Sequence, residues 1–271
     1  YITDFDKTYR VLFYFGKETD TLDPEGTVIS EKPLPVYADF IAASKQLTGT
    51  IEQVPPVYSA VKQAGERLSD KIRRGEAVTV PPRTVIIYSI DIEEIFYAPE
   101  PDTNRENPEM SAVRKVLGAV LCVRCSKGTY IRSLVRDIAH RCGSAAYVYA
   151  LRRTAVGPFT LEQAAGFSAL PPFGSTAAGT ESAPYSITEE EIKQAALPLS
   201  EAIARAMHFQ TAVLKEQYYA AFMNGKPISG HWFTSAQPLS DDGTTAVFYE
   251  GRCAGLITKN GSRFHYQIGN L

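Results

Sequence analysis

Seven basic side chains gather between positions 124 and 153, where Asp137 is the only acid and three tyrosines lie among them. Basic groups can neutralise a phosphate backbone, and tyrosine rings can stack on unpaired bases. A solvated basic helix face would have the same composition, and the pattern by itself does not separate the two interpretations. A second basic cluster, residues 62–74, holds five bases and two acids.

Carboxylates form a second group with chemical potential. Asp20, Asp23 and Glu25 lie in the stretch TDTLDPEG, and an aspartate on a loop can serve as a nucleophile. Aspartate is also frequent in turns because its side chain caps its own backbone. We favour the turn interpretation and do not assign Asp23 as a nucleophile.

A metal site is the third possibility. Cys122 and Cys125 form a C-x-x-C pair, and His140 and Cys142 follow. Ligands at that spacing normally lie on a tight knuckle, whereas residues three apart in a strand point to opposite faces. Buried free cysteines and no metal are therefore expected. No P-loop, G-x-G-x-x-G or G-x-S-x-G motif occurs, so NTPase, dinucleotide and acyl-hydrolase chemistry have no support.

The composition limits where these groups can act. The 271 residues carry 28 basic and 30 acidic side chains, a net charge of −2 and a pI near 6.2, so any polyanion site must be a local patch. Four cysteines are too few for a secreted disulfide framework, and we expect a cytoplasmic protein. Apolar runs are too short for a membrane span, and the mean hydropathy is −0.15.

Hydrophobic periodicity predicts the elements that must position these groups. Strands are expected over residues 9–16, 83–97 and 116–128, with two more at 246–250 and 253–258 near the end of the chain. Helices are expected over residues 36–47, 68–74 and 130–143. Residues 99–111 are rich in turn formers and predict an exposed loop, and residues 170–186 predict a linker or surface insertion.

Several segments together resemble one family, the bacterial TruB-type tRNA pseudouridine synthases. The matching segments are KTYRV and FGKETDT within 7–21, GTIEQVPPVYSAVKQAGERL at 49–68, PRTVIIY at 82–88, CSKGTYIRSLVRDIAHRCG at 125–143 and ALRRTAVGPF at 150–159. They keep the family's order and spacing over most of residues 1–165, and the combination of QVPPVYSAVK with CSKGTYIR is highly specific. The C-terminal part, with NGKPI and its final strands, is similar to a PUA-like domain.

The resemblance implies an α+β fold, with a mixed, mostly antiparallel sheet flanked by helices and a small C-terminal PUA-like β-barrel. The corresponding domains are a catalytic core over residues 1–168, a linker or insertion over 169–204 and an RNA-binding domain over 205–271. The implied activity is isomerisation of the T-loop uridine of tRNA, position 55, without a cofactor or metal. The implied partner is the T-arm of tRNA, and a monomer is expected.

The resemblance also assigns roles to residues. Tyr9 matches a tyrosine that stacks on the flipped base and is proposed to assist proton removal. Arg132 matches the arginine that pairs with the catalytic carboxylate, a role that suits its planar guanidinium. Further residues match or adjoin the substrate-binding motifs: Tyr130, Leu151, Lys62, Lys127, Arg152 and Arg153.

One family motif does not occur. The catalytic aspartate of the family lies in G-x-L-D-P-x-A-[ST]-G, ahead of KTYRV, and neither this motif nor the earlier K-P-x-G is present. Asp23 in TLDPEG follows KTYRV and lacks the small residues after proline. We expect the nucleophile to lie upstream of Tyr1 and the chain as given to be inactive without it. Two alternatives stay open: a tRNA-binding or tRNA-folding module that uses the same basic groove, and a metabolic enzyme that binds a small phosphate.

Overall fold

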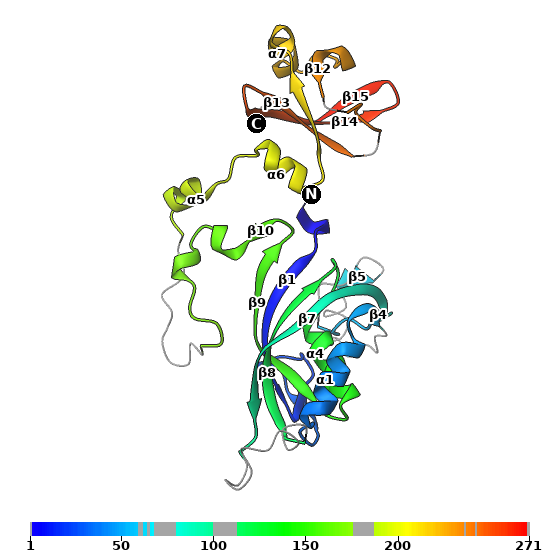
Figure 1. Ribbon diagram of the computed structural model, residues 1–271, viewed down its shortest axis with the longest axis vertical. Helices are drawn as coiled ribbons and strands as arrows, with labels where there is room; N and C mark the ends of the chain where they lie inside the picture. The colour runs from blue at the N-terminus through cyan, green and yellow to red at the C-terminus, as the bar shows by residue number, and fades with distance from the viewer. Residues whose placement is uncertain are drawn as a thin grey trace. The chain divides into compact units, whose positions relative to one another are not determined.

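The chain folds into two compact units in a computed structural model (Figure 1). The structure describes residues 2–58, 62–63, 66–67, 80–99, 113–175, 187–235, 237–241 and 243–269, and only the backbone of residues 62–63 and 66–67. One unit comprises Thr3–Val156 and Ala169–Pro184, and the other comprises Tyr1–Ile2, Gly157–Ser168 and Tyr185–Leu271. The unit that begins at Thr3 is called the sheet unit below, and the other is called the C-terminal unit.

The sheet unit is built on long antiparallel strands. The main sheet has the order β10-β9-β1-β8-β7-β4, and its strands are β1 (Lys7–Phe15), β4 (Gly49–Gln53), β7 (Arg83–Tyr97), β8 (Val116–Cys125), β9 (Ala146–Val156) and β10 (Phe159–Thr160). The pairs β1–β8, β1–β9, β7–β8 and β4–β7 are antiparallel. The strands predicted from alternating and β-branched residues are confirmed, because such residues pack well on a pleated, half-buried surface.

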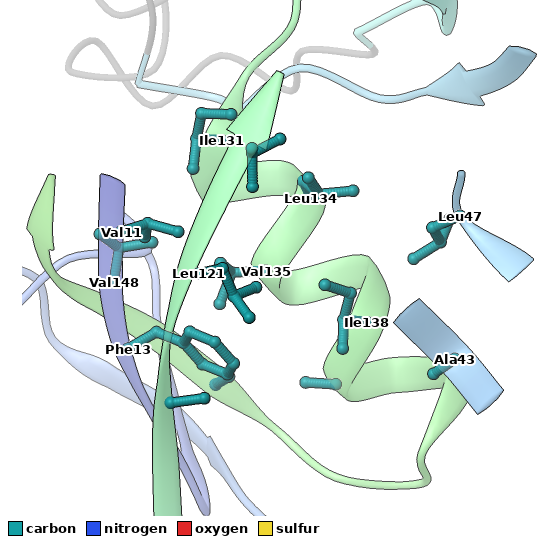
Figure 2. Close-up of a cluster of buried hydrophobic side chains, with 14 of the residues drawn as sticks. Val11, Phe13, Ala43, Leu47, Leu121, Ile131, Leu134, Val135, Ile138 and Val148 are labelled. Carbon is teal, nitrogen blue, oxygen red and sulfur yellow. The ribbon is translucent and has the colours of Figure 1, made fainter. Parts of the chain in front are cut away.

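Two helices pack on one face of this sheet, α1 (Tyr37–Gln46) and α4 (Ile131–Arg141). Figure 2 shows side chains of β1 and β8, among them Phe13 and Leu121, against Leu134 and Ile138 of α4. All four side chains are fully buried, and burial of each contributes about 1.5–3 kcal/mol. The predicted helices over 36–47 and 130–143 are confirmed, and this shared core fixes α4 on the sheet.

Shorter elements surround this core. They are η1 (Ile2–Asp4), a hairpin of β2 (Lys17–Thr19) with β3 (Val28–Glu31), and a second pair formed by β5 (Lys62–Gln63) and β6 (Glu66–Arg67). The predicted helix over 68–74 lies outside the described residues, as does nearly all of the predicted loop over 99–111.

The C-terminal unit contains a five-stranded sheet of order β12-β11-β13-β14-β15. Its elements and those that lead to it are η2 (Leu161–Gln163), η3 (Phe167–Ala169), α5 (Glu189–Ala195), α6 (Glu201–Ala206), β11 (Gln210–Leu214), η4 (Glu216–Tyr218), α7 (Tyr219–Met223), η5 (Gly230–Trp232), β12 (Phe233–Thr234), β13 (Thr244–Tyr249), β14 (Arg252–Asn260) and β15 (Arg263–Gly269). The strands β11 and β13 are parallel, and the other pairs are antiparallel. Phe222, Trp232 and Ile257 are buried at its centre.

The predicted α+β class with an antiparallel sheet and a separate C-terminal sheet is confirmed. The exact domain boundaries at 168 and 204 stay predictions. The two strands predicted near the end of the chain are present as β13 and β14, and the turn between them has positive φ at Glu250 and Gly251, as a tight hairpin turn requires. Within the described part of the chain, no helix is long and apolar enough to cross a membrane.

Candidate active site

Arg132 lies in the first turn of α4 and is held from two directions. Its Nη1 donates to the Asp23 carboxylate at 2.7 Å and to the Thr21 carbonyl at 2.8 Å. Its Nη2 donates to the Tyr58 carbonyl at 3.1 Å. The Arg132 and Asp23 side chains are 26% and 28% exposed, so the ion pair is partly shielded from water and screened less than a surface pair. The guanidinium is therefore fixed in orientation by three oxygen acceptors.

Asp23 has two functions in the structure. Its Oδ1 accepts from the Thr21 hydroxyl at 2.5 Å and from the Glu25 backbone N–H at 3.3 Å, which is the turn capping expected from the sequence. Its Oδ2 faces Arg132, 109 positions further along the chain, and no local pattern indicated that partner. A side chain at Gly26 would collide with this turn, because its Cβ would lie 2.2 Å from the Thr21 hydroxyl.

Gln53 anchors the start of α4. Its side chain is 1% exposed, and its Oε1 accepts from the backbone N–H of Tyr130 at 2.8 Å. Its Nε2 donates to the backbone carbonyl of Tyr130 at 3.1 Å. Tyr130 is the residue immediately before α4, so this amide fixes the helix end that carries Arg132. The sequence analysis assigned no role to Gln53, although it is the first residue of the family segment QVPPVYSAVK.

Tyr9 lies on the α4 side of the sheet. It packs against the hydrophobic core that includes Val11 of the same strand, and it is opposite Arg153 of β9 in the strand register. Burial raises the pKa of the Tyr9 phenol, Cys125 adds to the rise, and a charge and hydrogen bond from Arg153 oppose it. The phenol is therefore protonated at neutral pH. The structure brings Tyr9 and Arg153 together.

Arg152 lies on the opposite face of the sheet, since successive strand residues alternate. Its Nη2 donates to the Pro171 carbonyl at 2.7 Å. The Phe173 ring lies against two guanidinium groups. The guanidinium carbon of Arg10 is 4.8 Å from the ring centroid, and that of Arg152 is 5.6 Å from it. The structure thus separates Arg152 from Arg153, although the two were predicted together as substrate-binding residues.

The other predicted residues have different surroundings. Lys127 follows β8 and forms an exposed ion pair with Asp4 at 2.8 Å, which lowers the pKa of the Asp4 carboxyl. Leu151 is on β9 and is 44% exposed, the exposure that a wall of a binding surface needs. The side chain of Lys62 lies outside the described residues. These three assignments stay predictions.

The cysteines are free thiols in the structure. Cys125 is fully buried and Cys122 is half-buried, and they lie on opposite faces of β8. Burial raises the pKa of Cys125 to about 11 and that of Cys142 to about 12. The residues that the structure describes contain no group of three or more His, Cys, Asp or Glu side chains placed to hold a metal ion.

Comparison with solved structures defines the class of fold. A chain in the structure of an H/ACA RNP bound to a substrate RNA containing 2′-deoxyuridine superposes with a TM-score of 0.56 at 17% identity, covering 100% of this chain and 67% of that one. A chain in the crystal structure of a Cbf5-Nop10-Gar1 complex gives 0.53 at 20% identity, covering 98% and 67%. The fold is therefore the one shared with chains of these two complexes.

Sequence comparison then gives the family. The model of the TruB family pseudouridylate synthase N-terminal domain matches residues 1–131. The protein named tRNA pseudouridine synthase B from Treponema pallidum (strain Nichols) is 37% identical over 297 residues, which cover 98% of this chain and 81% of that protein. The protein of the same name from Pseudomonas fluorescens (strain Pf0-1) is 44% identical over 164 residues, covering 60% and 48%. The chain belongs to the TruB family of pseudouridylate synthases.

Proposed function

We propose that this protein isomerises uridine to pseudouridine in tRNA and that its target is the T-loop uridine at position 55. Family membership supports the reaction, since relatives that match nearly the whole chain are named tRNA pseudouridine synthase B. The observation that carries the site is the Arg132 guanidinium, which is held in a fixed orientation and paired with a carboxylate at the start of α4. Such a group can keep a catalytic carboxylate ionised and oriented.

In the proposed reaction, the target base is flipped out of the T-loop into the site. An aspartate carboxylate attacks C1′ of the ribose, the N1–C1′ bond breaks, and its electron pair leaves with the uracil. The uracil turns, C5 forms a bond to C1′, and the carboxylate departs. The proton on C5 is lost and N1 gains one, so atoms and charge balance without a cofactor.

We assign Arg132 to the catalytic carboxylate and Tyr9 to stacking on the flipped base. The Tyr9 phenol is protonated at neutral pH, because its pKa is raised. We therefore assign its ring to stacking and do not assign a phenolate as the base. Arg153 and Leu151 accompany Tyr9 on the substrate side, and Tyr130 lines the base pocket next to Arg132. The C-terminal unit is proposed to bind RNA beyond the T-loop.

Tritium release from a T-arm stem-loop labelled at C5 of the target uridine tests this proposal, because a binding or folding module releases none. Measured in the enzyme as the cell makes it, Arg132→Ala is expected to lower the release rate by more than about 10²-fold, with RNA affinity nearly unchanged. Arg141→Ala is the matched control, since Arg141 is exposed on the same helix and donates to the Gln46 side-chain oxygen at 3.2 Å. An Arg132→Ala enzyme with the wild-type release rate contradicts the assignment.

A further inference from the structure

Two side-chain contacts join α4 to the segment that runs from β2 to Asp23, one in the first turn of the helix and one in the last. At the first turn of α4, Arg132 pairs with Asp23. At the last turn, the Nε2 of His140 lies 2.6 Å from the Oε2 of Glu18, on β2. Residues 132 and 140 are two helical turns apart on nearby sides of α4, separated by about 12 Å of helix rise. The segment from β2 to the Asp23 turn is therefore fastened to α4 at both ends.

The acidic side chain of the second contact, Glu18, is more buried than that of the first, Asp23. The Glu18 side chain is 12% exposed and that of His140 is 49% exposed. A carboxylate removed from water needs a hydrogen-bond or ionic partner, and His140 provides it. Glu18 therefore holds β2 against the end of α4 rather than standing free in solvent.

The six residues from Glu18 to Asp23 form a short and stiff connection. The Thr19 hydroxyl donates to the Asp23 carbonyl at 2.7 Å. Leu22 is 4% exposed, and its carbonyl accepts from the backbone N–H of Val148 at 3.0 Å. A shift of Glu18 is thus transmitted to Thr21 and Asp23, which are the partners of Arg132.

We propose that Glu18 and His140 are positioning residues for the Arg132 guanidinium. Their contact sets where the Thr21 carbonyl and the Asp23 carboxylate meet Arg132, and it thereby sets the direction in which the guanidinium points. This inference rests on the proposed function, because it concerns the same arginine. Neither Glu18 nor His140 touches the substrate in this account, so they act on the chemical step only through Arg132.

Three variants of the enzyme test the proposal: Glu18→Ala, His140→Ala and the reversed pair Glu18→His with His140→Glu. Single-turnover tritium release with enzyme in excess separates the chemical step from binding, which a filter assay measures with the same stem-loop. Each alanine variant is expected to release tritium about tenfold more slowly. This loss is smaller than the roughly 10²-fold loss that a 1 Å displacement can cause, because Arg132 would be only partly misaligned. The dissociation constant for the RNA should change less than about twofold, and the reversed pair should restore the rate to within about threefold.

Lys17→Ala is the matched control. Lys17 adjoins Glu18 on β2 and pairs with Glu31 of β3 at 3.2 Å, but both side chains of that pair are largely exposed. The control should keep the wild-type rate. Alanine variants that melt at a lower temperature while the folded enzyme keeps its rate would overturn the proposal, because that result belongs to a merely structural contact. A reversed pair as slow as the single variants would also overturn it.

A spectroscopic measurement keeps the inference separate from the proposed function. In ¹⁵N-labelled enzyme, the Arg132 Nη–H signals should exchange slowly with solvent, since carbonyl and carboxylate acceptors bind them. Glu18→Ala should accelerate that exchange and Lys17→Ala should leave it unchanged. Unchanged exchange in Glu18→Ala would refute the positioning role, whereas a wild-type enzyme that releases no tritium would refute the proposed function.

Discussion

Gln53→Met is expected to destabilise the sheet unit by about 2–4 kcal/mol. Methionine fills a similar volume but can make neither hydrogen bond to Tyr130. The Tyr130 carbonyl keeps the backbone N–H of Leu134 as a donor at 3.0 Å, so the Tyr130 N–H is the group left without a partner. Loss of the bond to that carbonyl costs about 1 kcal/mol, and a buried donor without an acceptor costs about 1–3 kcal/mol.

Urea unfolding followed by far-ultraviolet circular dichroism measures this change. The single tryptophan, Trp232, is buried in the C-terminal unit, so its fluorescence reports that unit and not the sheet unit that contains Gln53. Gln46→Met is the control, since Gln46 is an exposed residue of α1 and its loss should cost under about 0.5 kcal/mol. A Gln53→Met protein that loses less than about 0.5 kcal/mol at an unchanged m-value refutes the reasoning.

Three further predictions concern other features of the sheet unit. Gly26→Ala should slow tritium release at least about tenfold, because its Cβ would lie 2.9 Å from the Thr21 backbone nitrogen and force open the turn that holds Arg132. Cys125 and Cys142 should resist iodoacetamide at pH 8 until urea is added. Burial raises the pKa values of these thiols to about 11 and 12 and leaves little thiolate to react. Rapid labelling of either thiol in the native protein, detected by mass spectrometry, would contradict this. Phe173→Ala should cost about 1–2 kcal/mol in the urea assay through its two guanidinium contacts, whereas Phe173→Tyr should cost little.

Local patterns were sufficient for the main elements of the sheet unit. The apolar spacing of Ile131, Leu134, Val135 and Ile138 predicted α4, and these residues are buried in the structure. Alternation predicted β7, and the run of β-branched and aromatic residues predicted β1. For α4 and β7, the sequence period equals the period at which side chains return to one face of the element, whereas β1 was predicted from its residue types.

Contacts between distant segments could not be predicted in this way. Asp23 was recognised as a turn residue, but its pairing with Arg132 depends on how β2 is placed against α4. Gln53 and Glu18 likewise acquire their partners only in the folded chain. The separation of Arg152 from Arg153 follows from strand alternation, but only once their segment is known to be a strand that pairs with β1.

The central position of β1 has a consequence for biosynthesis. This strand lies between β8 and β9. Tyr9, for example, pairs with Val123 of β8 on one side and with Arg153 of β9 on the other. At about 5–20 residues per second, a ribosome needs roughly 7–30 s after β1 to complete β9. During that interval at least one edge of β1 has no strand to pair with its backbone N–H and C=O groups, which exposes the nascent chain to aggregation and to chaperones. Such sequence-distant pairing also predicts slow refolding relative to helical proteins of equal size.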